Sequence, residues 1–403
     1  MRVLLTTNPG IGHLNPMLPI ASALRQAGHQ VAFASSASFC PVIEARGFQA
    51  LEAGLDWLET EVEANFPESR GMSPEELSSW FMTDLFTDIA AHQMVPDLLE
   101  IGARWKPDLI VRNDYEFGSC VAAECLGIPQ ATVSICFFMS PSLLKPLVGD
   151  QLAYLRSVHG LAPYPALDML YPYLYLSYAP ISVQPPELPM IKSLRPTDMH
   201  TDEESLPDWV YDMPERPTIY ASLGTVFNRV PDIFPAIVEG LRDEPINLIV
   251  TIGQNQDPEQ FGPQPPHIHI VRYIPHTLLF PLCDLFITHS PFYTVMSALS
   301  YGLPLLMVPI AGDQPAHAAR VAGLGVGRVL KRKAHPENYF GQSVPELSPE
   351  SVRVAVRELL GDPSYKMNAG RIKNDIESLE GPESAVDLLV RLVESRYSAM
   401  RAG

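Results

Sequence analysis

The stretch 288–314, THSPFYTVMSALSYGLPLLMVPIAGDQ, predicts the fold class of this chain. An apolar strand leads into it, and Ser290 and Pro291 are typical of a helix N-cap and of a first helical residue. Gly302 is typical of the end of that helix, and a second apolar strand is expected at 303–309. A strand, a helix and a strand joined by such short links form a βαβ unit, whose two strands run parallel. We therefore expect an open α/β sheet.

Polar residues stand at the ends of both strands of this unit. His289 closes the first strand, and Asp313 and Gln314 follow the second. Because the strands are parallel, these three residues are expected at the carboxyl edge of one sheet. Open α/β sheets bind their ligands at that edge.

The alternation of strand and helix starts twice in the chain. It begins at the N-terminus and begins again at 218–223, after the acidic, proline-punctuated tract 198–215. Such a tract packs poorly in a hydrophobic core and is typical of a linker between domains. Because 403 residues exceed what one hydrophobic core usually covers, two domains of roughly 200 residues are expected. The predicted division is 1–205, 206–380 and a C-terminal helix at 381–403.

The composition argues against several classes of partner. With 28 basic and 46 acidic residues the formal net charge is −18, which disfavours nucleic acid and anionic membranes. No run approaches the ~20 apolar residues of a membrane-spanning helix, so no stable membrane insertion is expected. The five cysteines include no Cys-x-x-Cys pair and are expected as free thiols in a reducing compartment. We therefore expect a soluble cytoplasmic protein.

The first turn of the chain carries a candidate general base. His13 follows Gly10-Ile11-Gly12, directly behind the first strand. An imidazole with an ordinary pKa near 6.5 can accept a proton at neutral pH; a solvated loop histidine is the alternative. Asn113 and Asp114 close another strand, and a carboxylate there could orient the imidazole. Since side chains alternate along a strand, only one of the two faces the same side as His13.

A second group of residues has the chemistry of a diphosphate site. Ser222, Gly224 and Thr225 end the first strand of the second half, where hydroxyls and glycine amides form a small anion nest. The helix that begins after His289 adds Thr294 and its N-terminal amides, which carry the positive end of the helix dipole. Together these groups predict that the second domain binds a diphosphate.

Three other kinds of site have weaker support. Gly10-x-Gly12 occurs in dinucleotide-binding oxidoreductases, but Asn15 stands where the third glycine belongs. His267 and His269 alternate on a strand, but no cysteine or carboxylate accompanies them and the chain has no Asp-x-Asp, so no metal site is expected. No G-x-S-x-G motif supports a serine nucleophile.

Further motifs run along nearly the whole chain. The first half carries G-I-G-H-L-N-P, P-D-L-I-V and A-A-E-C-L-G-I-P, and the second carries S-L-G-T, V-R-Y-I-P-H, L-F-I-T-H, A-L-x-x-G-x-P, D-Q-P and R-V-A-G-L-G-V-G. In these motifs the chain resembles the family 1 glycosyltransferases of the GT-B fold, especially bacterial enzymes that decorate natural products. The resemblance implies an α/β protein of two facing Rossmann-like domains with parallel sheets, and a C-terminal helix that crosses back to the first domain. It places the acceptor in the first domain and a dTDP- or UDP-sugar in the second.

The resemblance also implies roles for individual residues. His13 matches the base that takes the proton of an acceptor hydroxyl, whose oxygen then attacks the anomeric carbon with inversion. Asp313 and Gln314 match the pair that contacts sugar hydroxyls, and the segment 272–274 matches the one that borders the nucleotide base. The expected donor-binding residues are Ser222, Gly224, Thr225, Arg272, Tyr273, Ile274, His289, Ser290, Phe292, Tyr293, Thr294, Ser297, Asp313 and Gln314.

Three positions depart from the family pattern. Ser290 and Pro291 stand where the family has Gly-Gly or Cys-Gly, and Pro291 removes an N–H beside the phosphates. Ser297 stands where many UDP-sugar enzymes have a glutamate on the ribose, which favours a dTDP-sugar. In the family an aspartate often follows the strand that corresponds to 108–112; here Asn113 stands at that position and Asp114 comes one residue later. Either of them, or neither, could therefore assist the base.

Residues and resemblance together predict an inverting, metal-independent glycosyltransferase that moves a hexose or deoxyhexose from a nucleotide diphosphate to a hydroxyl of an apolar acceptor. No cofactor is expected besides the nucleotide-sugar, and a homodimer is left open. A catalytically silent GT-B protein that binds a partner is one alternative; transfer to a membrane lipid is another, for which the acidic balance offers little. Apolar side chains usually line such acceptor pockets. The expected wall, for which ordinary core packing is the alternative, is Trp57, Phe66, Trp80, Phe81, Phe137, Phe138 and Met139.

Overall fold

The computed structural model describes residues 1–164, 166–185, 188–197, 204–224, 228, 230–333 and 344–402, the side chains of 74–75 and 396–402 excepted. The chain divides into two compact units, Met1–Thr197 with Leu379–Gly403, and Asp198–Ser378. The boundaries lie at 197 and 378, where the sequence predicted 205 and 380. Each unit is built around its own parallel sheet.

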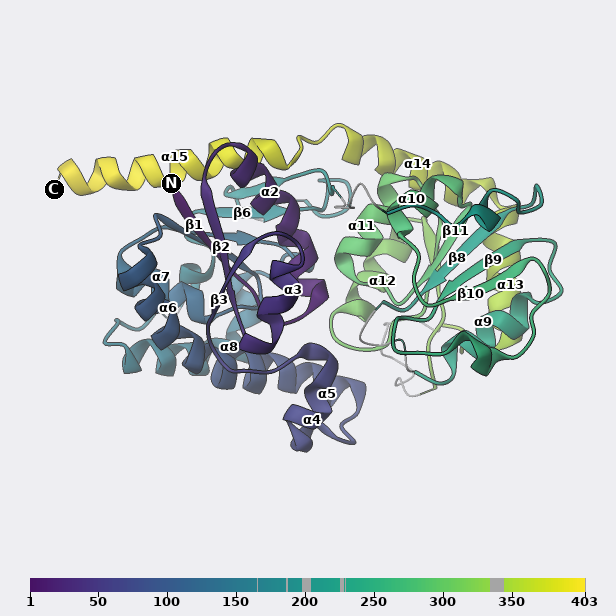
Figure 1. The fold of residues 1–403 in the computed structure, drawn as a ribbon, viewed down its shortest axis with the longest axis horizontal. Coiled ribbons are helices and arrows are strands. Elements are labelled where there is room, and N and C mark those ends of the chain that lie inside the picture. Colours follow the sequence, from purple (N-terminus) through teal and green to yellow (C-terminus); the bar gives the residue numbers. More distant parts are fainter. Residues whose placement is uncertain are drawn as a thin grey trace. The chain divides into compact units, whose positions relative to one another are not determined.

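The first unit contains a seven-stranded parallel sheet (Figure 1). Its central strands are short apolar runs such as VLL and LIV, which are buried because helices cover the sheet. In order across the sheet the strands are β3 (Gln49–Glu52), β2 (Gln30–Ser35), β1 (Arg2–Thr6), β4 (Leu109–Asn113), β5 (Gln130–Val133), β6 (Leu174–Ser177) and β7 (Ile191–Ser193).

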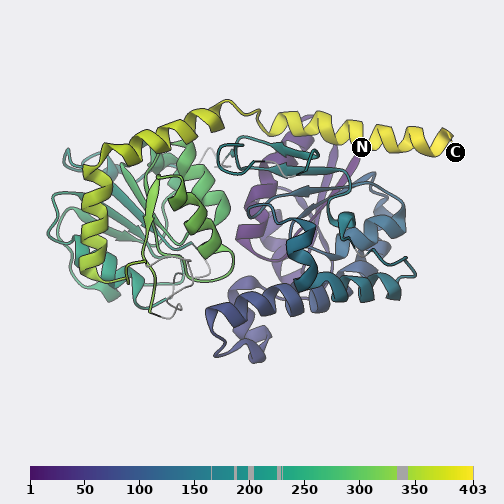
Figure 2. The same cartoon turned by 180° about the vertical axis from the view of Figure 1, so that it is seen from behind.

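Two groups of helices pack on this sheet (Figure 2). The long C-terminal helix α15 (Pro382–Ala402) lies along α2 (Leu18–Gln26), which in turn packs on β2, so the last helix belongs to the first unit. In the other group, α6 (Ala91–Trp105) packs against α7 (Gly118–Leu126), and the π-helix η5 (Phe81–Ala90) contacts both α6 and α8 (Pro141–Val158). Shorter helices of this unit are α1 (Ile11–Leu14), η1 (Asn15–Met17), η2 (Ala37–Phe39), α3 (Cys40–Glu44), η3 (Glu59–Glu61), α4 (Val62–Asn65), η4 (Pro67–Ser69), α5 (Pro74–Trp80) and η6 (Asp168–Leu170).

The second unit has a six-stranded parallel sheet (Figure 1). In order across the sheet its strands are β10 (Ile268–Val271), β9 (Asn247–Thr251), β8 (Thr218–Ser222), β11 (Leu285–Thr288), β12 (Leu305–Met307) and β13 (Gly327–Val329). Among its helices, α9 packs on α13 and α11 packs on α14. The helices are η7 (Asp208–Val210), α9 (Ile233–Leu241), η8 (Pro258–Phe261), α10 (His276–Leu279), η9 (Phe280–Leu282), α11 (Phe292–Ser300), α12 (Gln314–Gly323), α13 (Pro349–Gly361) and α14 (Pro363–Glu377).

The strand order reverses once in each sheet. In the first sheet the chain builds outward from β1 to β2 and β3, then returns to β4 on the other side of β1. The second sheet has the same reversal between β8 and β11. In open α/β sheets the crevice outside the carboxyl ends of two such strands is where ligands bind. The loops that follow β1, β4, β8 and β11 therefore hold the candidate site residues.

Two helix starts differ from the sequence prediction. Ser290 is not an N-cap: its φ is 74°, and Pro291 takes the N-cap position, so α11 begins at Phe292. An N-cap residue normally has extended backbone, whereas a left-handed residue turns the chain sharply between strand and helix. Apolar residues at spacings of 3 and 4 predict a helix after the first strand from about Leu14 to Ala27, but the helical segment begins at Ile11. His13 consequently lies on a helical turn and not in a loop.

None of the described helices is long and apolar enough to cross a bilayer. All five cysteines are free thiols, and four are buried. Burial raises the pKa of Cys120 to about 11, so this thiol stays protonated and unreactive at neutral pH.

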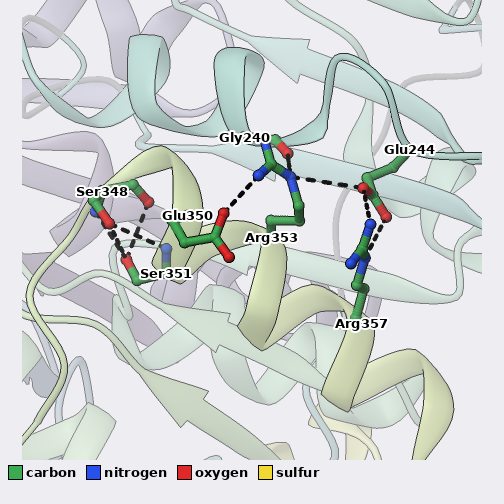
Figure 3. A network of polar contacts seen from close by, with 7 residues as sticks. All are labelled: Gly240, Glu244, Ser348, Glu350, Ser351, Arg353 and Arg357. Atoms are coloured by element: carbon green, nitrogen blue, oxygen red, sulfur yellow. Dashed lines mark hydrogen bonds and ion pairs between the residues drawn. The ribbon is translucent and has the colours of Figure 1, made fainter.

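Helices α9 and α13 are joined by the carboxylate of Glu244 (Figure 3). Its oxygens accept hydrogen bonds from Nε and Nη2 of Arg357 at 2.9 and 2.8 Å, and Nε of Arg353 lies 3.7 Å from Oε1. Arg353 also donates to the carbonyl of Gly240 in α9, at 3.1 Å. The hydrogen bonds from Arg357 hold the pKa of Glu244 below its usual range.

We expect Glu244→Gln to lower the midpoint of thermal unfolding at about pH 7 and to have much less effect at about pH 3. The folded-state pKa of Glu244 is lowered, so its ionised form stabilises the fold above the unfolded pKa. That contribution is lost as the pH falls through the folded pKa. Thermal melts at both pH values test this, with the exposed Glu350, which bonds Arg353 at 2.6 Å, changed to Gln as the matched control. An equal loss at both pH values would contradict the expectation.

Candidate active site

His13 lies at the first reversal of strand order, on α1 behind β1. Its side chain is only 8% exposed, and burial lowers its pKa from 6.5 to about 4, an effect that a contact with the side chain of Asn113 opposes in part. The ring stands edge-on to Phe86 with centroids 5.6 Å apart, and the ring of Tyr115 is 6.5 Å away. His13 is therefore a neutral imidazole at neutral pH, in mainly apolar surroundings.

The two residues at the end of β4 point to different sides. Asn113 donates from Nδ2 to Oγ1 of Thr7 at 3.1 Å, and it is the one whose side chain contacts His13. Asp114 instead accepts from the hydroxyl of Tyr175 at 3.0 Å, and burial raises its pKa to about 6. The structure thus does not place Asp114 beside the imidazole, because alternation along the strand turns it toward β5 and β6.

A carboxylate that the sequence did not single out does lie next to the imidazole. Oε1 of Glu59, the first residue of η3, is 4.0 Å from Nε2 of His13. The N–H of Glu59 donates to the carbonyl of Pro9 at 3.0 Å, which docks η3 on the turn behind β1. No spacing in the sequence links residues 13 and 59, so only the folded chain shows this pair.

Most of the predicted acceptor wall belongs to the hydrophobic core of the first unit. Trp57 and Phe66 pack edge to face with centroids 5.9 Å apart, and Phe66 does the same with Trp80 at 5.5 Å. Phe138 packs at 5.1 Å on two buried tyrosines. These four are core residues, and Phe137 is buried as well.

A smaller aromatic group connects this core to His13. Phe86, which lies in the aromatic segment 55–95 expected to line the acceptor, stacks on Tyr115 at 5.9 Å and packs on Phe81 at 5.4 Å. The hydroxyl of Tyr115 reaches the sulfur of Met139 at 3.8 Å. Phe81 and Met139 are partly exposed, and each contacts one of the two aromatic neighbours of His13, Phe86 and Tyr115.

The second reversal of strand order brings together Ser222, Gly224 and His289. Ser222 Oγ accepts from the N–H of Gly224 at 3.3 Å, and Gly224 has a φ of 67°. A Cβ at Gly224 would lie 2.9 Å from Cε1 of His289, so the glycine leaves room for the ring. Burial lowers the pKa of His289 to about 4, which keeps it neutral. Thr225 lies outside the described residues.

The start of α11 follows directly. The N–H of Ser290 donates to Oγ1 of Thr288 at 3.1 Å, and Oγ of Ser290 is buried with no hydrogen-bond partner among the described residues. The first hydrogen bond of the helix runs from Val295 N–H to the carbonyl of Pro291, at 3.0 Å. The amides before Val295 thus lie at the N-terminal end of the helix, where an anion is favoured.

The predicted donor-binding residues on α11 split into two pairs. Phe292 and Ser297 are buried, with 2% and 0% exposed, so their side chains belong to the interior. Tyr293 and Thr294 are partly exposed in the first turn. Ser297, which was predicted among the donor-binding residues, therefore presents no side chain at the surface of this unit.

Asp313 and Gln314 are positioned differently from each other. The side-chain oxygen of Gln314 accepts from the N–H groups of Ile310 and Ala311 at 2.9 and 3.2 Å, so it stabilises its own loop. Asp313 is partly exposed, and its carboxylate lies 3.5 Å from Nε2 of His317, one turn along α12. Of the pair, Asp313 is the one whose side chain is partly exposed, whereas Gln314 is buried.

His317, which was not predicted as a site residue, connects two loops of the second unit. While Nε2 faces Asp313, Nδ1 lies 3.2 Å from the carbonyl of Ser290, and the ring is 5.9 Å from that of Phe292. The histidine is buried, with 3% of its side chain exposed. It therefore fixes the left-handed turn at Ser290 and the carboxylate of Asp313 together.

The segment predicted to border the nucleotide base follows β10. Nε of Arg272 donates to the carbonyl of Gln256 at 3.0 Å, and the hydroxyl of Tyr273 donates to Glu204 at 2.6 Å. Ile274 is buried. Arg272 and Tyr273 are more than half exposed, at the same carboxyl edge as His289.

The histidines with metal-like spacing have other partners. His267 Nε2 lies 3.1 Å from the carbonyl of Arg242, and His269 stacks on Trp209 with centroids 4.0 Å apart. Within the described residues no group of three or more His, Cys, Asp or Glu side chains could hold a metal ion.

The sequence and the fold of the chain are similar to those of several known proteins. The models of the erythromycin biosynthesis protein CIII-like N-terminal and C-terminal domains match residues 22–224 and 241–392. The L-demethylnoviosyl transferase of Streptomyces niveus is 30% identical over 82% of this chain and 85% of its own. The 4'-demethylrebeccamycin synthase of Lentzea aerocolonigenes is 26% identical over 97% and 99%. The crystal structure of the glycosyltransferase VinC in complex with dTDP superposes with a TM-score of 0.78 at 26% identity, over 98% of this chain and all of VinC.

The chain belongs to the family 1 natural-product glycosyltransferases of the erythromycin biosynthesis protein CIII-like type, which have the GT-B fold. The predicted fold class is confirmed, and so is the prediction of a glycosyltransferase.

Proposed function

We propose that this glycosyltransferase moves a hexose or deoxyhexose from a nucleotide diphosphate to a hydroxyl of an apolar acceptor, with inversion and without a bound metal ion. The observation that carries the proposal is the neutral, buried His13 at the first reversal of strand order. It is matched in the second unit by His289 and the N-terminal end of α11. A base and an anion site are the two devices that transfer to a hydroxyl requires.

The reaction uses these groups in one displacement. His13 accepts the proton of the acceptor hydroxyl, and the oxygen forms a bond to the anomeric carbon as the bond from that carbon to the diphosphate breaks. The electron pair leaves with the diphosphate, where the amides at the start of α11 stabilise the growing negative charge. Attack from the side opposite the leaving group inverts the configuration.

Two observations favour dTDP-sugars over UDP-sugars as donors. Ser297 offers no carboxylate to a ribose and is fully buried, so this position gives no advantage to a 2′-hydroxyl. The similar structure of VinC is a complex with dTDP. Phe81, Phe86 and Met139 near the base favour an apolar acceptor.

Ligand stabilisation followed by product analysis tests this proposal. We expect dTDP and dTDP-sugars to raise the midpoint of thermal unfolding more than UDP or GDP and their sugars, because a ligand stabilises the state that it binds. From a donor with an axial linkage we expect a product with an equatorial linkage. Turnover should be undiminished in EDTA. If no nucleotide shifts the unfolding midpoint, the use of a nucleotide-sugar is contradicted. A retained configuration would contradict inversion, and a loss of turnover in EDTA would contradict independence of a metal ion.

His317→Ala is expected to raise the KM for the nucleotide-sugar roughly 3- to 10-fold, the value of one or two neutral hydrogen bonds, with little change in kcat. The reason is that His317 holds both Ser290 and Asp313. His317→Asn, whose amide can still donate to the Ser290 carbonyl, should recover part of the affinity. His267→Asn serves as a control in the same unit, and a KM unchanged in His317→Ala would contradict the expected role.

A further inference from the structure

The turn that carries Glu59 is held against the turn that carries His13. Besides the hydrogen bond from Glu59 N–H to the carbonyl of Pro9, at 3.0 Å, the two turns meet at Gly10. A Cβ on Gly10 would lie 2.0 Å from Oε2 of Glu59 and 3.2 Å from Cδ2 of His13. The carboxylate therefore occupies the space that a side chain at residue 10 would fill.

The glycine at residue 10 is required for space and not for backbone conformation. Its φ and ψ are −144° and 144°, extended values that any residue adopts. Only the close approach of the Glu59 carboxylate and the imidazole edge explains why a Cβ is excluded. The turn behind β1 thus leaves space for the Glu59 carboxylate because residue 10 has no side chain.

The distance between Glu59 and His13 makes their interaction weak before proton transfer and strong after it. At 4.0 Å, Oε1 of Glu59 and Nε2 of His13 are too far apart for a hydrogen bond. While the imidazole is neutral the carboxylate gains little from it. Once the imidazole carries a proton, two opposite charges face each other at 4.0 Å with side chains only 8% and 18% exposed, so the attraction is weakly screened.

Burial otherwise makes His13 a poor proton acceptor, because it disfavours the imidazolium. The other described groups around the ring are Phe86, Tyr115 and the amide of Asn113, and none of them carries a charge at neutral pH. Within the described structure, Glu59 is the one carboxylate paired with the ring. Glu59 thus places a negative charge beside the imidazole, which neither the amide of Asn113 nor Asp114, turned toward Tyr175, provides.

We propose that Glu59 is the carboxylate partner of His13, a positioning residue that stabilises the imidazolium formed when the acceptor hydroxyl gives up its proton. The inference rests on the proposed function. The O–H bond of the acceptor breaks as an N–H bond forms on His13, and Glu59 keeps its charge throughout. Since the attraction exists mainly after the proton has moved, it lowers the barrier and not the energy of the bound substrates.

Glu59→Gln is expected to lower kcat/KM for the acceptor about 10- to 100-fold, the effect of one or two units in the proton affinity of His13. The KM of the nucleotide-sugar should be unchanged, because His289 and α11 belong to the second unit. The acidic limb of the kcat/KM profile should move to lower pH, since the imidazolium loses its counter-charge.

Two controls and a second variant make the test specific. Glu61→Gln changes an exposed carboxylate two residues away, and Tyr115→Phe removes the other titratable group that faces the ring; neither should move the acidic limb. Gly10→Ala, which displaces the carboxylate and keeps its charge, should lower kcat/KM as well.

The outcomes separate this inference from the proposed function. If the wild-type protein transfers no sugar from any nucleotide, the proposed function fails. If it is active and Glu59→Gln, shown to be folded by its thermal melt, keeps the wild-type kcat/KM and acidic limb, only the role of Glu59 is overturned. Should Glu59→Gln not fold, an undiminished kcat/KM in Gly10→Ala overturns it equally.

Discussion

His13→Ala is expected to lower kcat/KM by roughly 10²- to 10⁴-fold while leaving the affinity for dTDP and dTDP-sugars nearly unchanged, the size of effect that a general base supplies. The proposed base acts only on the acceptor hydroxyl, and His289 and α11, which we propose to bind the diphosphate, lie in the other unit. Steady-state kinetics measures the loss, and thermal shift with dTDP measures the retained binding.

The lowered pKa of His13 gives this prediction a pH dependence. Since burial lowers the pKa to about 4, the proton-free form needed for catalysis is present throughout the neutral range, and the acidic limb should appear well below 6.5. His29→Ala is a suitable control, because that histidine interacts with the N-terminal amine, 3.3 Å away, and not with the site. Undiminished turnover in His13→Ala would move the role of base to another group.

The second large effect is expected on stability. Arg112→Met should lower the free energy of unfolding of the first unit by about 3–5 kcal/mol, the range measured when one partner of a buried charged network is removed. Arg112 is fully buried on β4. Its Nη1 donates to the carbonyls of Asn113 and Asp114 at 2.9 and 3.0 Å, and Nη2 donates to that of Leu170 at 2.5 Å.

The reason for this size is the number of acceptors that would lose their donor. A methionine fills much of the volume of the arginine but donates no hydrogen bond, so several buried carbonyls would be left unsatisfied. Chemical denaturation measures the loss, with Arg104→Met as a control, because Arg104 and its partner Glu100 are both about 70% exposed. A loss below about 1 kcal/mol would show that water replaces the guanidinium in the core.

Local sequence patterns were sufficient for the central strands of the sheets and for the residues that follow them. The apolar strand at 285–288 and the helix to Ser300 were predicted within a few residues from their periodicity and from the glycine at 302. His13 and His289 were placed at strand ends from position alone. In a parallel sheet every strand carries its carboxyl end to the same edge, so a residue that follows a strand has its place fixed by topology.

The prediction was less accurate where a side chain has a choice of direction. Of the two residues at the end of β4 that the sequence left open as partners of His13, Asp114 turns to Tyr175. The side-chain oxygen of Gln314, for which the resemblance implied a contact with sugar hydroxyls, accepts hydrogen bonds from its own loop. Ser290 adopts a left-handed backbone, although serine is a common N-cap. In each case the packing of the neighbouring strand or loop decides the direction, and that packing has no short-range signature.

By itself the sequence determined the two α/β units and which residues follow the strand ends, because these follow from periodicity, glycine positions and the geometry of parallel strands. The family was recognised from the resemblance of the motifs. Only the tertiary structure placed Glu59 at His13, Phe86 between the aromatic core and His13, and His317 between two loops. Such contacts join residues far apart in the chain, and they depend on which side chains fit in the space that a neighbour such as Gly10 leaves open.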